Sequence, residues 1–256
     1  MKKIAVCAFC VLSVLGAAAL PKFSEKTPEQ REAEMAKFGG TVVKPSNGKS
    51  VLLADMTANG DEFAETFVKR STMMLHLTFD VKKVAAPEGD VGKTVRSLKD
   101  KAHPAVIALV DRPGEAALGV FPEEAVAFVN IAPLKAADAI RYKARVNKEL
   151  WRAVGFALGG YAMARPGCVM DAVFSVSELD KIPSAQLMPT RYGFIYKSAA
   201  KLDIPDGRAV PYVKALREGW APPATNDAQR AAVQKWEEVK AKRAAKEAAK
   251  KAAPAK

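Results

Sequence analysis

The residues with the clearest chemical potential lie between Asn147 and Met170, in the segment NKELWRAVGFALGGYAMARPGCVM. Its single carboxylate is Glu149, which follows Lys148 directly and precedes Arg152 by three positions. A glutamate can act as a general base, and lysine or arginine can bind a carboxylate. The chain has no G-x-S-x-G motif, no phosphate-binding glycine loop and no Cys/His metal spacing. This segment is therefore the candidate site.

An amphipathic helix from roughly Lys135 to Leu158 positions these residues. Apolar side chains recur at three- and four-residue steps, which predicts one buried face and one charged face. The predicted apolar face comprises Ile140, Ala144, Trp151, Val154 and Leu158, and the charged face comprises Arg141, Arg145, Lys148, Glu149 and Arg152.

The helix resembles the zinc-binding helix of the metzincin peptidases. Their motif is H-E-x-x-H-x-x-G-x-x-H, in which the histidines bind zinc and the glycine lets the chain turn back, above a methionine-containing turn. Here KELWRAVG keeps Glu149 and Gly155 in register. The three histidine positions hold Lys148, Arg152 and Leu158.

Within that clan the chain resembles the archaemetzincins, over about Ser50 to Pro189. Cys168-Val169-Met170 matches their C-x-M Met-turn, and Ser177 to Asp180 resembles the acidic segment that follows. The chain departs from the pattern at Gly159, where a cysteine is expected, in a loop about four residues longer, and in lacking the later cysteine pair near Gln186 to Thr190. Upstream, Ile107 to Ile131 resembles the two strands along whose edge substrate would lie.

This resemblance implies a degenerate site without metal or cofactor. Arginine has no lone pair to give, lysine must first lose its proton, and leucine cannot coordinate. His76 and His103 lie in other predicted elements and lack ligand spacing. Without zinc to lower the pKa of water from 15.7 to about 7, Glu149 faces an unactivated nucleophile. We therefore expect no hydrolase activity.

Two interpretations of the remaining charges stay open. In the first, Glu149 pairs on a solvated helix surface with Arg145 and Arg152, each pair contributing ~0.2 to 0.5 kcal/mol. In the second, Lys148 and Arg152 fill the former metal cavity with positive charge, so that the cleft binds a carboxylate or a peptide C-terminus.

The elements around the helix predict an α/β (α+β) domain, and the resemblance implies a metzincin-like, twisted mixed sheet with packed helices. Ala105 to Val110 is a continuous apolar run, typical of a strand buried on both faces. Further strands are predicted at Ser50–Ala54, Leu75–Val81, Leu118–Phe121 and Ala125–Ile131, the last at an edge, with helices at Asp61–Met74 and Val91–Lys101.

Five regions follow from composition and from the resemblance. Residues 1–19 read as a signal peptide, 20–48 as a peripheral helix beginning at Thr27 and ending at Gly39-Gly40, and 49–190 as the metzincin-like domain. Residues 191–225 form a covering segment with aromatic side chains that we expect in a core. Residues 226–256 form a basic Ala/Lys-rich tail, helical or disordered, with nine Lys or Arg against four Asp or Glu from Asp227 onward.

The leader predicts export to the periplasm or beyond, with cleavage near Ala19 and no transmembrane anchor afterwards. Cys7 and Cys10 leave with it, so Cys168 cannot form an internal disulfide and is expected to be a buried, inert thiol. The formal charge of +12 falls to about +10 without Lys2 and Lys3. Sparse aromatics argue against nucleic acid as a partner.

Three functional hypotheses follow. The first is a secreted, metal-free pseudopeptidase that binds peptide or protein. The second is an envelope-associated structural or interaction protein whose basic tail binds anionic envelope polymers. The third, an active zinc peptidase, needs ligands from elsewhere in the chain.

Overall fold

A computed structural model of the chain describes residues 27, 29–30, 36–37, 39–58, 60–159, 168–184 and 186–252. The predicted signal peptide and most of the predicted N-terminal helix lie outside these residues. At the start of that helix, Thr27 and Gln30 exchange hydrogen bonds in a capping box: Thr27 Oγ1 accepts from Gln30 N at 3.2 Å, and Gln30 Oε1 accepts from Thr27 N at 3.1 Å.

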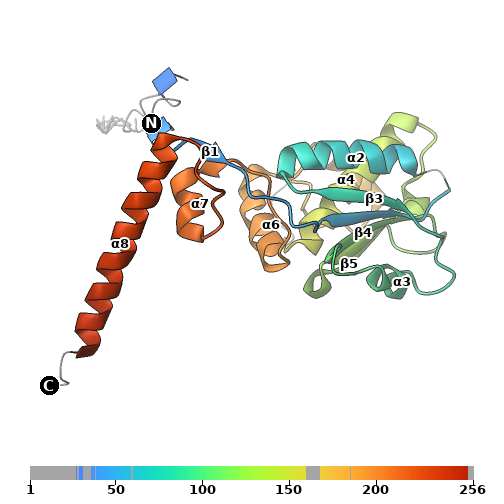
Figure 1. Cartoon of the computed structure of the whole chain (residues 1–256). Coiled ribbons are helices and arrows are strands. Elements are labelled where there is room, and N and C mark those ends of the chain that lie inside the picture. Colours follow the sequence, from blue (N-terminus) through green and yellow to red (C-terminus); the bar gives the residue numbers. More distant parts are fainter. Residues whose placement is uncertain are drawn as a thin grey trace, which may run out of the picture.

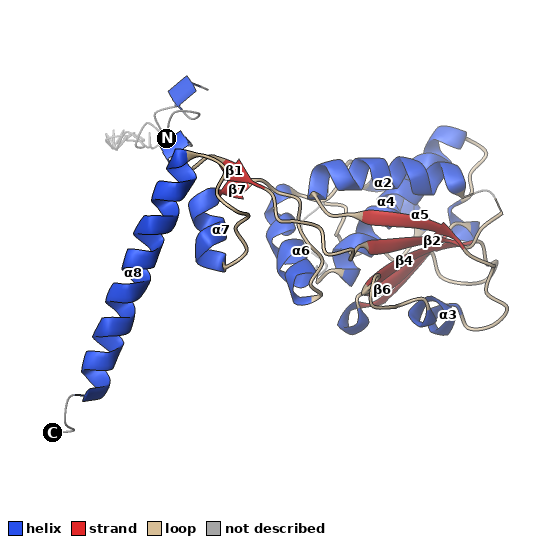
Figure 2. Ribbon diagram, viewed as in Figure 1, coloured by secondary structure: helices blue, strands red, loops and turns tan. Residues whose placement is uncertain are grey.

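The centre of the molecule is a five-stranded mixed sheet with the order β3-β2-β4-β6-β5 (Figures 1 and 2). Four strands are parallel, and β5 pairs antiparallel with β6 at one edge. The strands are β2 (Val51–Asp55), β3 (Phe79–Lys83), β4 (Ala105–Val110), β5 (Leu118–Phe121) and β6 (Val126–Asn130).

Alternate residues of each strand face two different hydrophobic cores. Val51 and Leu53 of β2 point to one face, where α2 (Asp61–Leu75) and α4 (Ala139–Ala157) pack, as Figure 1 shows. Leu52 of β2 points to the other face, against α3 (Val91–Ser97). All six residues of β4 are buried, as the apolar run predicts for a strand covered on both faces.

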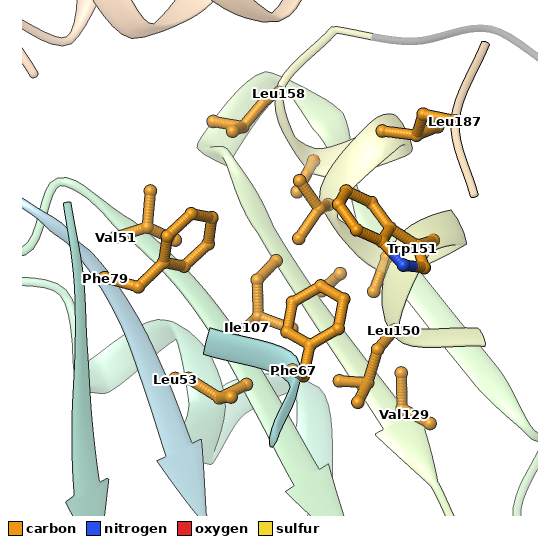
Figure 3. Close-up of a cluster of buried hydrophobic side chains, with 14 of the residues drawn as sticks. Val51, Leu53, Phe67, Phe79, Ile107, Val129, Leu150, Trp151, Leu158 and Leu187 are labelled. Carbon is orange, nitrogen blue, oxygen red and sulfur yellow. The ribbon is translucent and has the colours of Figure 1, made fainter. Parts of the chain in front are cut away.

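The larger core contains the best-buried aromatic residue of α4. Trp151 is fully buried and packs edge-on against Phe67 of α2, with ring centroids 5.1 Å apart (Figure 3). Such aromatic pairs contribute about 0.5–1.5 kcal/mol beyond the area they bury. The pair fixes α4 against α2, and so fixes the rotation of the helix that carries the candidate site.

Helix α4 begins later than predicted. Ala132–Leu134 forms a short 3-10 helix, Lys135 is extended, and the side chain of Asp138 caps α4 by accepting a hydrogen bond from Ile140 N at 2.9 Å. Ile140 is 81% exposed, so its place on the predicted apolar face is wrong. It belongs to the first turn, in which Tyr142 contacts the core and Ile140 points to solvent.

Two strand predictions also need correction. Leu75 is the last residue of α2, and the chain reverses at His76, which has a left-handed φ of 51°, so the third strand starts at Phe79 and not at Leu75. The strand predicted at Ala125–Ile131 is not at an edge, because β6 lies between β4 and β5.

The C-terminal third divides between two places. Helices α5 (Val176–Lys181) and α6 (Pro189–Lys201) contribute Leu179, Ile195 and Ala199 to the larger core. The remaining elements lie away from the sheet in Figure 1, where β1 pairs with β7 and α7 packs beside α8. Their bounds are β1 (Thr41–Val42), β7 (Val210–Pro211), α7 (Tyr212–Glu218) and α8 (Asp227–Ala252).

The predicted core role of the C-terminal aromatics holds for Tyr212, which is 1% exposed, but not for Phe194, which is 46% exposed. The basic tail is a continuous helix from Asp227 to Ala252, and Asn226 Oδ1 caps it by accepting from Gln229 N at 2.9 Å. None of the helices described combines the length and the apolar character needed to cross a lipid bilayer.

Candidate functional site

A cleft of about 350 Å³ lies between the edge strand β5 and helix α4. Glu149 and Arg152 reach it from α4, and the chain after the Met-turn closes the opposite side. Its walls are residues 115–118, Pro133, Leu134, Glu149, Arg152, residues 173–176 and Leu179.

Arg152 connects the helix to the Met-turn. Its Nε donates to Glu149 Oε2 at 3.0 Å, and its Nη1 donates to the carbonyl oxygens of Val169 and Asp171 at 2.9 and 2.6 Å. The side chain is only 6% exposed and also lies over the ring of Phe156, 5.5 Å from its centroid. The Nη2 group makes no hydrogen bond within the described residues. One guanidinium therefore pairs with Glu149 and holds two loop carbonyls, and Arg152 is also part of the cleft wall.

Glu149 is buried, which corrects the interpretation of a solvated charge network. Glu149 and Arg152 are 3% and 5% exposed, whereas a surface pair would be mostly accessible. Burial raises the pKa of the Glu149 carboxyl above its usual value, and the nearby guanidinium of Arg152 offsets only part of that rise. Arg145 does not pair with Glu149, because its guanidinium binds Asp180.

Lys148 lies on the same side of α4 but does not line the cleft. Its Nζ donates to the carbonyl oxygen of Leu179 at 2.9 Å, and the residue is 8% exposed. Burial lowers the pKa of this ammonium group. Lys148 therefore fastens α5 to α4, and the anion-binding role that we predicted for it has no support from its position.

The third predicted metal position is in the core. Helix α4 does not turn away at Gly155 but continues to Ala157, with Leu158 as its C-cap. Leu158 is fully buried among the apolar side chains that cover the sheet, as Figure 3 shows, and it is not part of the cleft wall. Of the three positions, only Arg152 is therefore part of the cleft wall.

The Met-turn lies beneath α4. Cys168, Val169 and Met170 are fully buried, and the free thiol of Cys168 fits the predicted inert role. A Cβ atom built on Gly155 would lie 2.3 Å from Met170 Sδ, which no real pair of atoms tolerates. Gly155 is therefore needed here for the close approach of Met170 and not for a change in chain direction.

The donor set does not fit zinc. Zinc sites in proteins use thiolate, imidazole or carboxylate ligands, and the aligned positions hold an ammonium, a guanidinium and an aliphatic side chain. Among the described residues, no group of three or more His, Cys, Asp or Glu side chains is arranged to hold a metal ion. Neither His76 nor His103 lines the cleft, and the ring of His103 binds Asp100 and Asp80 instead.

Asn130 is a structural residue of the site whose role the sequence did not reveal. It is fully buried at the end of β6. Its Oδ1 accepts from the backbone N–H groups of Arg112 and Ala132, and its Nδ2 donates to the carbonyl oxygens of Arg112 and Glu115. Four hydrogen bonds fix the loop that leads into β5. The sequence feature that could have indicated this role is that Asn130 is the one polar residue in the otherwise apolar run AVAFVNI.

The Arg145–Asp180 pair predicts an acid-dependent loss of stability. Two hydrogen bonds of 2.8 and 2.6 Å from Arg145 lower the pKa of Asp180. Because the folded-state pKa is depressed, the contribution is complete above the unfolded pKa of about 3.9 and is lost as the pH falls through the folded value. We expect Asp180→Asn to flatten the decrease in stability below about pH 4, measured by urea unfolding between pH 2 and 7. Arg145→Ala should flatten it equally, and unchanged slopes in both variants would contradict the assignment.

Comparison with known proteins finds the fold but no close relative. No protein-family model and no curated protein matches the chain. The crystal structure of archaemetzincin from Methanopyrus kandleri is 21% identical and covers 61% of this chain and 98% of its own, with a TM-score of 0.51.

Two further structures match less well. The archaemetzincin from Archaeoglobus fulgidus, solved with malonate, is 16% identical with a TM-score of 0.45, and a zinc-dependent peptidase from Methanocorpusculum labreanum is 14% identical with a TM-score of 0.44. Each match covers 56% of this chain and 98% of the other. From the Methanopyrus kandleri match and the mixed sheet with its packed helices, we conclude that this chain has an archaemetzincin-like fold.

Proposed function

We propose that this protein is an exported, catalytically inactive relative of the archaemetzincins that binds extended peptides. The observation that carries the proposal is Arg152. A guanidinium stands where the metzincin motif has its second histidine, and it is hydrogen-bonded to the glutamate that would be the general base. An arginine in this place repels a divalent cation and binds the carboxylate that catalysis would need.

The edge strand supports peptide binding. Ala117 O accepts a hydrogen bond from Asn130 N, and hydrogen-bonded pairs alternate along antiparallel strands, so the backbone groups of Leu118 and Val120 face away from β6. No strand pairs with that side of β5 among the described residues. An extended peptide can add there as a further strand, as in other proteins that bind peptides by strand addition.

The cleft offers a binding site for the C-terminal carboxylate of such a peptide. Arg152 Nη2 has no hydrogen-bond partner in the part of the chain that is described, and it belongs to a residue in the cleft wall. Phe174, which is 90% exposed, stands in the opposite wall and offers an apolar contact. A peptide along β5 whose carboxylate reaches Arg152 would use both. Export rests on the leader pattern of residues 1–19.

A single backbone group tests this mode of binding. We expect Val120→Pro to weaken the binding of unstructured peptides by roughly tenfold or more, because proline removes an outward N–H and leaves the ladder to β6 intact. Val120→Thr keeps that N–H and a similar shape, so it should bind like the native protein. The measurement is fluorescence anisotropy of a labelled peptide library with the purified mature protein. Equal affinities for the two variants would rule out strand addition on β5.

Inactivity is tested on the same preparation. After dialysis against excess zinc and removal of free metal, elemental analysis should find far less than one zinc per chain, and the bound peptides should be recovered intact. Stoichiometric zinc together with peptide cleavage would contradict the proposal.

A further inference from the structure

A second surface lies between α7 and α8, two helices that lie far from β5 in Figure 1. It is a groove of about 770 Å³ with an apolar floor, to which α7 contributes Val213 and α8 contributes three alanines, Trp236 and Val239. The alanines are Ala228, Ala231 and Ala232.

Hydrogen bonds from buried side chains hold the two helices of the groove in place. Buried Gln229 of α8 donates from Nε2 to the carbonyl oxygen of Gly39 at 3.0 Å, and its Oε1 accepts from Thr225 N at 2.7 Å. Tyr212 of α7 donates its hydroxyl to the carbonyl oxygen of Pro222 at 3.0 Å. These bonds connect the first turn of α8 to the chain just before β1, and α7 to the chain that leads into α8. The two helices therefore present a preformed surface.

The rim of the groove carries one sign of charge. Lys37, Arg217, Lys235 and Arg243 line it, no acidic side chain does, and no ion pair joins any of the four to an acid among the described residues. Arg243 lies over the face of Trp236, 5.9 Å from the ring centroid. Four cations surround an apolar floor. A binding partner that matches this surface is apolar in the middle and acidic on both sides.

The length and the concave shape of the groove indicate which class of anionic partner fits it. The residues of α8 in the groove, from Ala228 to Arg243, extend over roughly 22 Å at 1.5 Å per residue, the length of about four helical turns. The small alanines let another helix approach closely. A flat lipid surface would contact a convex face and would not enter a groove, and a second copy of basic α8 would be repelled.

We propose that this groove binds an acidic amphipathic helix of a partner protein. Apolar side chains at three- and four-residue spacing would fill the floor beside Trp236, and Asp or Glu on the flanks would pair with the four cations. The groove shares no residue with the peptide cleft, so this proposal is independent of the function proposed above.

The test uses the full mature chain and a synthetic 16-residue helical peptide with leucine at every third and fourth position and glutamate elsewhere. Binding is followed by anisotropy of the labelled peptide. We expect Lys235→Glu combined with Arg243→Glu to weaken binding by roughly tenfold or more. The matched control, Arg230→Glu with Lys240→Glu, makes the same charge change on α8 outside the groove and should leave the affinity near the native value.

Other outcomes overturn the proposal. Equal weakening in the two double variants would show non-specific attraction to a basic helix. Equal binding of the peptide in which lysine replaces glutamate would remove the role of charge. Binding to vesicles of phosphatidylglycerol and phosphatidylcholine without binding to the acidic peptide would make the surface a membrane contact. A circular dichroism spectrum matching that of the native protein shows that each variant is folded.

Discussion

Replacing Arg152 by alanine is expected to lower the free energy of unfolding by about 3–5 kcal/mol, because the change leaves a buried carboxylate without its cation. Glu149 is 3% exposed, and Arg152 is the partner that the structure gives its carboxyl group. The carbonyl oxygens of Val169 and Asp171 would lose their donor in the same step. The measurement is urea unfolding at pH 7, followed by circular dichroism.

The exposed face of the same helix supplies the control. Arg141 is exposed, and Arg141→Ala should change the stability by no more than about 0.5 kcal/mol. Arg152→Lys keeps the charge but cannot reach Glu149 and two carbonyls with one planar fork, so an intermediate loss is expected. If Arg152→Ala were as mild as Arg141→Ala, the buried ion pair would not exist in solution.

The pH dependence of the Arg152→Ala variant separates electrostatics from packing. Burial already raises the pKa of Glu149 in the native protein, and loss of Arg152 should raise the pKa further. A folded state that holds a proton more tightly than the unfolded chain loses stability as the pH rises. The deficit of Arg152→Ala should therefore be larger at pH 8 than at pH 5. Exchanging both residues, as Glu149→Met with Arg152→Met, should recover the part of the loss that comes from the buried carboxylate, and so remove its pH dependence, but not the part that comes from the two carbonyl oxygens left without a donor.

The sequence predicted the fold well where a residue's surroundings follow from its own segment. The β4 strand was predicted with its observed bounds, because six apolar residues in a row leave no polar face to expose. The start of β3 was misplaced because Leu75 and Leu77 alternate like a strand, while no glycine or proline marks the end of α2. His76 makes that reversal in a left-handed conformation, which is uncommon for residues other than glycine and which no local pattern indicated.

The candidate site was harder to predict from the sequence than the fold, because its charged side chains are buried by segments that are distant in sequence. A charged helix face normally contacts water, so Glu149 and Arg152 were open to a surface interpretation. In the structure the chain at Val169–Asp171 passes over that face and supplies two carbonyl acceptors for Arg152. The spacing within α4 contains no information about this loop. The archaemetzincin resemblance predicts a Met-turn beneath the helix, and in the structure Met170 lies against Gly155 of α4.

Met170 and Gly155 should be energetically coupled. Met170 is fully buried, so Met170→Ala is expected to cost about 2–5 kcal/mol through lost burial and the cavity left behind. Gly155→Ala should cost about 1–3 kcal/mol, because a Cβ at Gly155 would lie 2.3 Å from Met170 Sδ and 3.0 Å from Leu187 Cδ2, and an enclosed thioether has little room to move. The first change creates the space that the second one needs.

The double variant should therefore be less unstable than the sum of the two single changes, by about 1–3 kcal/mol. With the thioether gone, alanine at position 155 would fill part of the cavity and gain the ~1 kcal/mol by which it favours a helix over glycine. Gly193→Ala is the matched control. That glycine is also inside a helix, but nothing lies within 4 Å of its added Cβ, so the same substitution should stabilise the protein. Additive losses at Gly155 and Met170, measured by urea unfolding of all four proteins of the cycle, would show that the methionine does not pack beneath the helix. The Met-turn that the metzincin resemblance predicts beneath the helix would then be misplaced.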